Sequence, residues 1–100
     1  MAINYFLNIV TTSPYEIKET DEVVFVNVPA TASVVLPTVA GGMNTGYYIK
    51  DYSGNASKNP IFITASGGAT INGVSFAILN VNYSQIQVIW DGSNWQTISN

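Results

Sequence analysis

Short runs of β-branched and aromatic residues, each stopped by proline, glycine, asparagine or aspartate, place the strongest constraint on how this chain folds. Valine and isoleucine are its commonest apolar residues, whereas leucine occurs only at Leu7, Leu36 and Leu79. β-Branched side chains fit a pleated strand and lose rotamer freedom in a helix. No segment has convincing helical periodicity. The sequence therefore predicts one all-β domain, an antiparallel β-sandwich or a barrel-like domain.

The positions of the stop residues predict where the strands lie. We expect strands at 15–19, 22–28, 32–36, 46–51, 60–64, 69–72 and 74–79, followed by a final hairpin. If Gly92-Ser93 is a two-residue loop, Trp90 sits directly opposite Trp95. Both faces of this hairpin carry large apolar side chains, so we expect it to be covered on both sides. The two tryptophans are candidates for the core or, alternatively, for stacking against a ligand.

The N-terminal segment up to Val10 alternates as a strand does, with apolar groups on both faces. An uncharged segment of this kind is an aggregation hazard when it is exposed. We expect residues 1–13 to form an N-terminal arm that precedes an all-β module at 14–100. The arm is expected to be buried, either in its own sheet or against a neighbouring chain. Its candidate interface or anchoring residues are Ile3, Tyr5, Phe6, Leu7 and Ile9.

The composition argues against several classes of function. Only 9% of the residues are charged, the net charge is −3, and three cations cannot form a basic stripe for a phosphate backbone. Cysteine and histidine are absent, which removes disulfides, thiolate nucleophiles, the commonest general base and the commonest metal ligand. No apolar run approaches the roughly 20 residues of a membrane helix. We therefore expect no nucleic-acid binding, no cofactor, no metal and no membrane insertion.

The acidic residues offer little for catalysis. They are Glu16, Glu19, Asp21, Glu22, Asp51 and Asp91. A glycosidase needs two carboxylates about 5–9 Å apart. Asp51 and Asp91 both lie at strand ends, but an aspartate in a turn usually accepts hydrogen bonds from its own following backbone. No base or electrophile accompanies them, so we predict a protein that is not an enzyme and has no catalytic residue.

A resemblance to a known type of module rests on four stretches that occur in order. They are 49–56 (IKDYSGNA), 59–63 (NPIFI), 67–73 (GGATING) and 88–95 (VIWDGSNW), preceded by 15–17 (YEI), 21–27 (DEVVFVN) and 34–37 (VVLP). Together they resemble a β-module found in bacteriophage tail fibres, head fibres and capsid decoration proteins. The resemblance covers residues 14–100 and implies a non-enzymatic virion structural protein that assembles as a homotrimer.

Two functions follow from this resemblance as expectations. The first is a trimeric capsid decoration or head-fibre subunit, whose partners are copies of itself and other virion proteins such as the major capsid protein. The alternative is a carbohydrate- or receptor-binding module of a tail fibre, with tyrosines and tryptophans stacking against a surface glycan. In both cases the protein is expected in the virion, after synthesis in the host cytoplasm.

Overall fold

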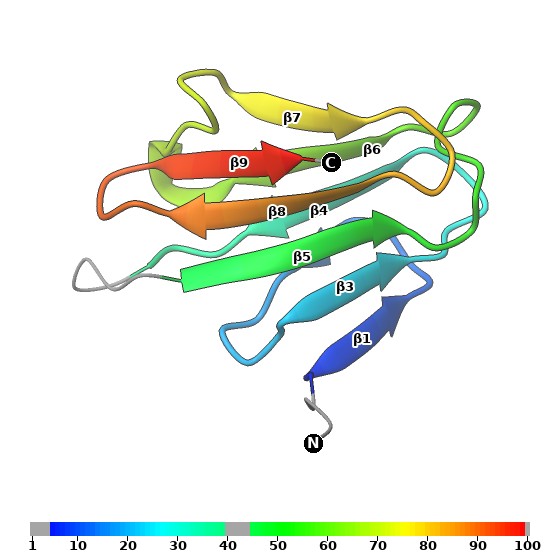
Figure 1. Cartoon of the computed structure of the whole chain (residues 1–100), viewed down its shortest axis with the longest axis horizontal. Helices are drawn as coiled ribbons and strands as arrows, with labels where there is room; N and C mark the ends of the chain where they lie inside the picture. The colour runs from blue at the N-terminus through cyan, green and yellow to red at the C-terminus, as the bar shows by residue number, and fades with distance from the viewer. Residues whose placement is uncertain (1–4, 40–44, 100) are drawn as a thin grey trace.

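The computed structural model describes residues 5–39 and 45–99. In these residues nine strands form two sheets that pack face to face as a sandwich (Figure 1). Sheet A contains, in spatial order, β1 (Leu7–Val10), β3 (Val23–Val26), β5 (Thr45–Asp51), β8 (Gln85–Trp90) and β9 (Trp95–Ser99). Sheet B contains β2 (Tyr15–Glu16), β4 (Ala32–Leu36), β6 (Ile61–Ala65) and β7 (Phe76–Leu79).

The chain winds back and forth between the two sheets. Strands β1 to β6 enter sheet A and sheet B alternately, so each connection carries the chain across the sandwich and back. Successive strands within one sheet are consequently parallel: β1, β3 and β5 in sheet A, and β2, β4 and β6 in sheet B. Strands β7, β8 and β9 then pair antiparallel with their neighbours. The expectation of an all-β sandwich is confirmed, but the sheets are mixed rather than antiparallel, and they do not close into a barrel.

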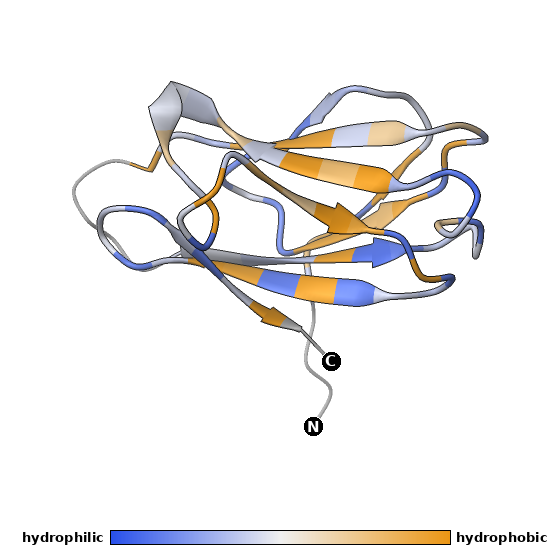
Figure 2. Cartoon of the chain, turned by 90° about the horizontal axis from the view of Figure 1, so that it is seen from above, coloured by the Kyte–Doolittle hydropathy of each residue, from blue (hydrophilic) through white to orange (hydrophobic). Residues whose placement is uncertain are grey.

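The core lies between the sheets because most strands alternate inward and outward side chains (Figure 2). Strand β4 shows this alternation along its whole length, with Ala32, Val34 and Leu36 buried and Ser33 and Val35 half-buried. The fully enclosed apolar residues come from both sheets. They include Val24, Val34, Leu36, Tyr47, Ile49, Ile63, Ile71, Val88 and Trp95.

The final hairpin has the predicted register. Trp90 pairs with Trp95, and the rings meet edge to face with centroids 5.4 Å apart. Gly92 adopts a φ of 103°, which favours glycine, and the Asp91 carboxylate accepts hydrogen bonds from the backbone amides of Ser93 and Asn94. The described residues do not cover the outer face of the hairpin, where Ile98 is 54% exposed. The expectation of cover on both sides is therefore wrong for a single copy.

The segment expected to be a strand at 69–72 forms only isolated bridges. Ile71 bridges to Val74 and to Trp95, and the segment runs along the outer edge of β9. A short 3-10 helix, Ser66–Gly68, occupies the turn before it. The position of this segment beside β9 closes that edge of sheet A.

The N-terminal segment joins the chain's own sheet, which is one of the two alternatives expected for it. Strand β1 pairs in parallel with β3, with Leu7 beside Val23 and Val10 beside Val26. Ile3, one of the candidate interface residues, lies outside the described residues.

Candidate interaction surface

An apolar surface covers the outer face of sheet A where β1, β3 and β5 lie side by side. The register aligns Leu7, Val23 and Tyr48 in one row, and Ile9, Phe25 and Lys50 in the next. We define the A-face patch as the apolar residues of these rows together with Tyr5. They are Tyr5, Leu7, Ile9, Val23, Phe25 and Tyr48.

The A-face patch is open to solvent in the single chain. Tyr5 is 54% exposed, Leu7 50%, Ile9 46% and Tyr48 45%. Scattered exposed apolar residues are ordinary on a soluble protein, whereas a contiguous group of this kind is a candidate interaction site. Of the expected interface residues, the structure brings Tyr5, Leu7 and Ile9 into one surface, while the neighbouring Phe6 is 70% exposed.

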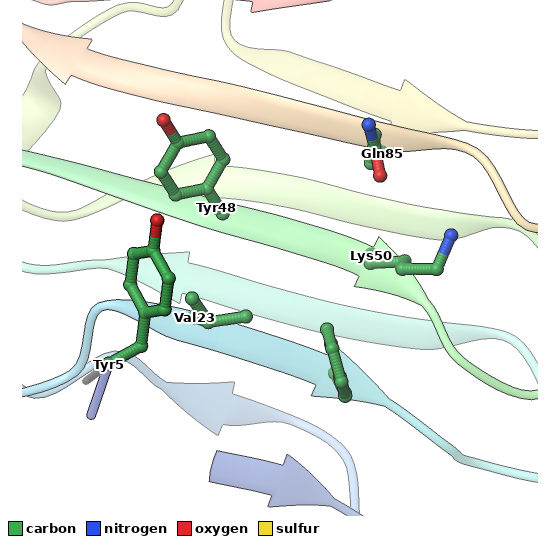
Figure 3. Close-up of a pocket in the computed structure, with 6 residues that line it drawn as sticks. Tyr5, Val23, Tyr48, Lys50 and Gln85 are labelled. Atoms are coloured by element: carbon green, nitrogen blue, oxygen red, sulfur yellow. The ribbon is translucent and has the colours of Figure 1, made fainter. Parts of the chain in front are cut away.

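A shallow depression of about 300 Å³ lies within this surface (Figure 3). Tyr5 and Tyr48 stand close together on one side of it, and Lys50 and Gln85 lie at the other (Figure 3). Val23 completes the labelled lining. The depression therefore combines two phenol rings with one ammonium and one amide group.

The charge of Lys50 is held at the margin of the patch. The Lys50 Nζ donates a 2.9 Å hydrogen bond to the backbone carbonyl of Tyr83 and lies 5.9 Å from the centroid of the Tyr83 ring. Phe25, in the same row, stacks against Tyr52 with ring centroids 5.3 Å apart. The rows from β1 to β5 thus present one anchored cation among apolar side chains.

Strand β1 has an open edge beside the patch. The carbonyls of Phe6 and Val10 accept hydrogen bonds from the β3 side, from Val23 and Asn27 respectively. In a parallel ladder alternate residues bond to a given neighbour, so the backbone groups of Leu7 and Ile9 point away from β3. Within the described residues, no segment pairs with this outer side of β1.

A chain of hydrogen bonds anchors β1 from the interior of the sandwich. The Asn8 Nδ2 donates to the Tyr15 hydroxyl at 2.7 Å, and that hydroxyl donates to Asp21 Oδ2 at 2.6 Å. Asp21 also accepts from the Lys18 amide at 3.0 Å. Burial and the Asp21 carboxylate raise the pKa of Tyr15 to about 12. This network fixes the inner side of β1 while its outer side stays open.

The two carboxylates considered for catalysis lie at opposite ends of β8. The Asp51 amide bonds to the Ser84 carbonyl just before β8, whereas Asp91 directly follows that strand. At about 3.3 Å per residue, the length of β8 separates them by about 20 Å. They do not form the close pair that a glycosidase needs.

Asp51 instead organises two loops. Its carboxylate accepts hydrogen bonds from the Ser53 hydroxyl and from the amides of Gly54, Ala56 and Tyr83, at 2.9 to 3.2 Å. Burial raises the pKa of Asp51, but these hydrogen bonds together outweigh it and leave the pKa below its ordinary value. Asp51 thus has the structural role in a turn that the sequence predicts, because its carboxylate holds the loop at 53–56 and the backbone of Tyr83.

The two tryptophans differ in exposure. Trp95 is fully buried and packs against Tyr47, with ring centroids 6.0 Å apart, so it belongs to the core. Trp90 is half-buried.

The sequence argument did not single out Val23, Phe25 or Tyr48 as a surface. The available signal was the uninterrupted apolar run at 23–26, which places apolar side chains on both faces of one strand.

In the part of the chain that the structure describes, no three acidic, histidine or cysteine side chains gather as metal ligands would. The same residues include no helix of the length and hydrophobicity required to span a bilayer. Comparison with known proteins adds no further assignment, since no protein-family model matches the chain and no curated protein matches it significantly.

Proposed function

We propose that this protein is a non-enzymatic structural subunit of a bacteriophage virion, which assembles as a homotrimer and serves as a capsid decoration or head-fibre subunit. The assignment to a virion rests on the resemblance of residues 14–100 to phage fibre and decoration modules. The self-association rests on one structural observation, the exposed A-face patch beside the open edge of β1.

The size of the patch supports a protein partner. A large side chain presents about 200 Å² when fully exposed, so the four half-exposed members present on the order of 400 Å². A standard interface takes about 800 Å² from each partner. The large apolar side chains of the A-face patch therefore supply about half of the area that one partner contributes to a standard interface.

The charge pattern favours a second copy as that partner. The rows across β1, β3 and β5 contain a single charged side chain, Lys50, which is anchored to Tyr83. Because only 9% of the residues are charged, another surface of the same chain can pack against the patch without strong like-charge repulsion and without burying unpaired charges. A strongly charged partner would find no complementary groups there.

Light scattering on the purified protein tests the assembly. A trimer has three times the 10.8 kDa mass of the chain. Leu7→Lys introduces a charge into the patch on the strand with the open edge and should give monomers. Val81→Lys is the matched control, because Val81 is an apolar residue that is 63% exposed and lies outside the patch. A parent protein that scatters as a monomer at micromolar concentration overturns the proposal.

Binding to particles tests the location. Purified capsids that lack this protein should bind it stoichiometrically in a sedimentation assay if it decorates the major capsid protein. Binding to tail or baseplate particles instead would assign the protein to a fibre.

A glycan-binding module is the second candidate, and the depression beside Tyr5 and Tyr48 favours it. Aromatic rings stack against sugar faces, while Gln85 and Lys50 supply hydrogen-bonding groups for hydroxyls. A glycan array identifies the ligand, and Tyr48→Ala should then abolish binding. Phe76→Ala is the control, since this ring is similarly exposed but lies on sheet B, away from the depression. An array without any hit counts against this function.

A further inference from the structure

Within the described residues, each sheet has one edge strand that is neither paired on its outer side nor protected by shortness or charge. These edges are β1 in sheet A and β7 in sheet B. The other two edges are closed or guarded. Segment 70–72 covers β9, and β2 has only two residues, one of them the exposed Glu16. Proteins commonly blunt an edge strand by shortness or charge, and neither β1 nor β7 contains a charged residue.

We infer that β1 of one copy adds to β7 of the next copy, so that sheet A of one subunit continues into sheet B of its neighbour. This inference rests on the proposed self-association and specifies which elements carry it. The partner of the open edge is thus a second copy of this chain, bound through backbone hydrogen bonds as in strand addition.

The two strands match in length and pattern. Each has four residues, with sequences LNIV and FAIL, and each alternates two exposed side chains with two more buried ones. The exposed residues are apolar in both: Leu7 and Ile9 at 50% and 46%, and Phe76 and Ile78 at 46% and 38%. Paired strands bring opposite side chains to about 5 Å. The joined sheet would therefore carry one continuous apolar surface across the junction.

The symmetry of the contact agrees with a ring. Pairing β1 with β1 makes a two-fold dimer and leaves β7 open in both copies. Pairing β1 with β7 is a contact between two different surfaces, which is the kind that a ring of three requires. In a closed ring this contact occupies both open edges of every subunit.

Disulfide trapping tests the pairing directly, because the chain contains no cysteine. Single-cysteine variants at Leu7 or Ile9 are co-expressed with single-cysteine variants at Phe76 or Ile78, and each is also expressed alone. We expect oxidised mixed dimers in at least one of the four combinations, since opposed strand positions meet the geometry of a disulfide. Cross-linked dimers of the Leu7 or Ile9 variant alone, or no mixed dimer in any combination, overturn the inference.

A proline substitution provides a second, independent test. The amide of Ile9 points away from β3, so Ile9→Pro removes a donor only at the open edge, where proline is tolerated. We expect this variant to keep its cooperative unfolding and to scatter as a single 10.8 kDa chain rather than as a trimer. Ile9→Val, which keeps the amide, should remain trimeric. A folded Ile9→Pro trimer overturns the inference.

The two proposals fail differently. A parent protein that is a trimer but gives no mixed dimers contradicts the strand pairing alone. A parent protein that is monomeric and gives no cross-links contradicts both. Mixed dimers in a protein that forms longer chains support the pairing and contradict the trimer.

Discussion

The two edge strands of sheet A, β9 and β1, differ in whether their outward backbone groups are hydrogen-bonded. At β9, the outward amides of Trp95 and Thr97 donate to the Thr70 carbonyl and to Asn72 Oδ1 at 2.9 and 3.0 Å. At β1, no described segment takes the outward groups of Leu7 and Ile9. The described residues therefore satisfy one edge of the sheet internally and leave the other edge open.

The side chains follow the same division. Strand β9 turns its largest residue, Trp95, into the core. Strand β1 directs Leu7 and Ile9 outward, so its apolar content adds to a surface rather than to the core. Substitutions at β9 should therefore act on the stability of one chain, whereas outward substitutions at β1 should act on assembly.

The largest expected effect comes from removing the core side chain of β9. Trp95→Ala should lower the free energy of unfolding by about 3–5 kcal/mol, because the cavity cannot fully collapse. Ile98→Ala, on the outer face of the same strand, should change it by less than about 0.5 kcal/mol in the monomeric state. Chemical denaturation of both variants provides the measurement. Similar losses for the two would break the assignment of β9 to the core.

A variant distant from both edges of sheet A should lower the free energy of unfolding and leave β9 covered and β1 open. Asp51→Ala leaves the amides of Gly54, Ala56 and Tyr83 without their acceptor, at a cost of about 2–3 kcal/mol. Because the folded pKa of Asp51 is lowered, its stabilisation is present above the ordinary aspartate pKa and is lost as pH falls through the folded value. Urea unfolding from pH 7 to pH 2 should show a smaller acid loss in Asp51→Ala than in the parent. An equal acid loss contradicts this role.

The inner anchor of β1 should contribute less. Tyr15→Phe removes the hydroxyl between Asn8 and Asp21 and should cost about 1.5–3 kcal/mol, the range for hydrogen bonds to charged groups. The folded pKa of Tyr15 is about 12 against an ordinary 10.0, so its stabilisation is complete below pH 10 and declines as pH rises toward 12. Unfolding at pH 9 and pH 11 measures this. Between pH 9 and pH 11, Tyr15→Phe should lose less unfolding free energy than the parent. An equal loss in the two proteins would show that the titration of Tyr15 does not cause the decrease.

The smallest effect on the free energy of unfolding is expected at Asn72, whose exposed side chain bonds to the edge of β9. Asn72 adopts a φ of 52°, which glycine tolerates, so Asn72→Gly removes the side-chain bonds to Thr97 without backbone strain. Water replaces these exposed bonds, and the cost should be about 1 kcal/mol or less. The Thr97 amide should nevertheless exchange faster with solvent. Asn82→Ala loses a comparable bond to Ser57 elsewhere and should leave Thr97 unchanged.

The local features of the fold were predictable from the sequence, and the long-range winding was not. The Trp90–Trp95 register follows from a two-residue turn, and the limits of β4 follow from residues that stop a strand on either side. The parallel pairing of β1, β3 and β5 joins partners that are far apart in the sequence, as between Leu7, Val23 and Tyr48. An apolar pattern shows which side of a strand is buried, but it does not identify the neighbouring strand.

The candidate surface was predictable only in part. Tyr5, Leu7 and Ile9 follow from alternation within one segment. Val23 and Tyr48 join them through parallel pairing, which local pattern does not reveal. Segment 69–72 was expected to be a strand, yet it lies beside β9 through isolated bridges, because the turn at Asn72 and Gly73 prevents a longer ladder.

Hydrogen exchange at the two edges of sheet A tests the central claim most directly. Amide exchange is compared at a protein concentration where light scattering gives the trimer and at a dilution where it gives the monomer. The account predicts that the amides of Leu7 and Ile9 are protected only in the trimer, while those of Trp95 and Thr97 are protected equally in both. Rapid exchange of Leu7 and Ile9 in the trimer would contradict the claim that the open edge of β1 is completed by a second copy.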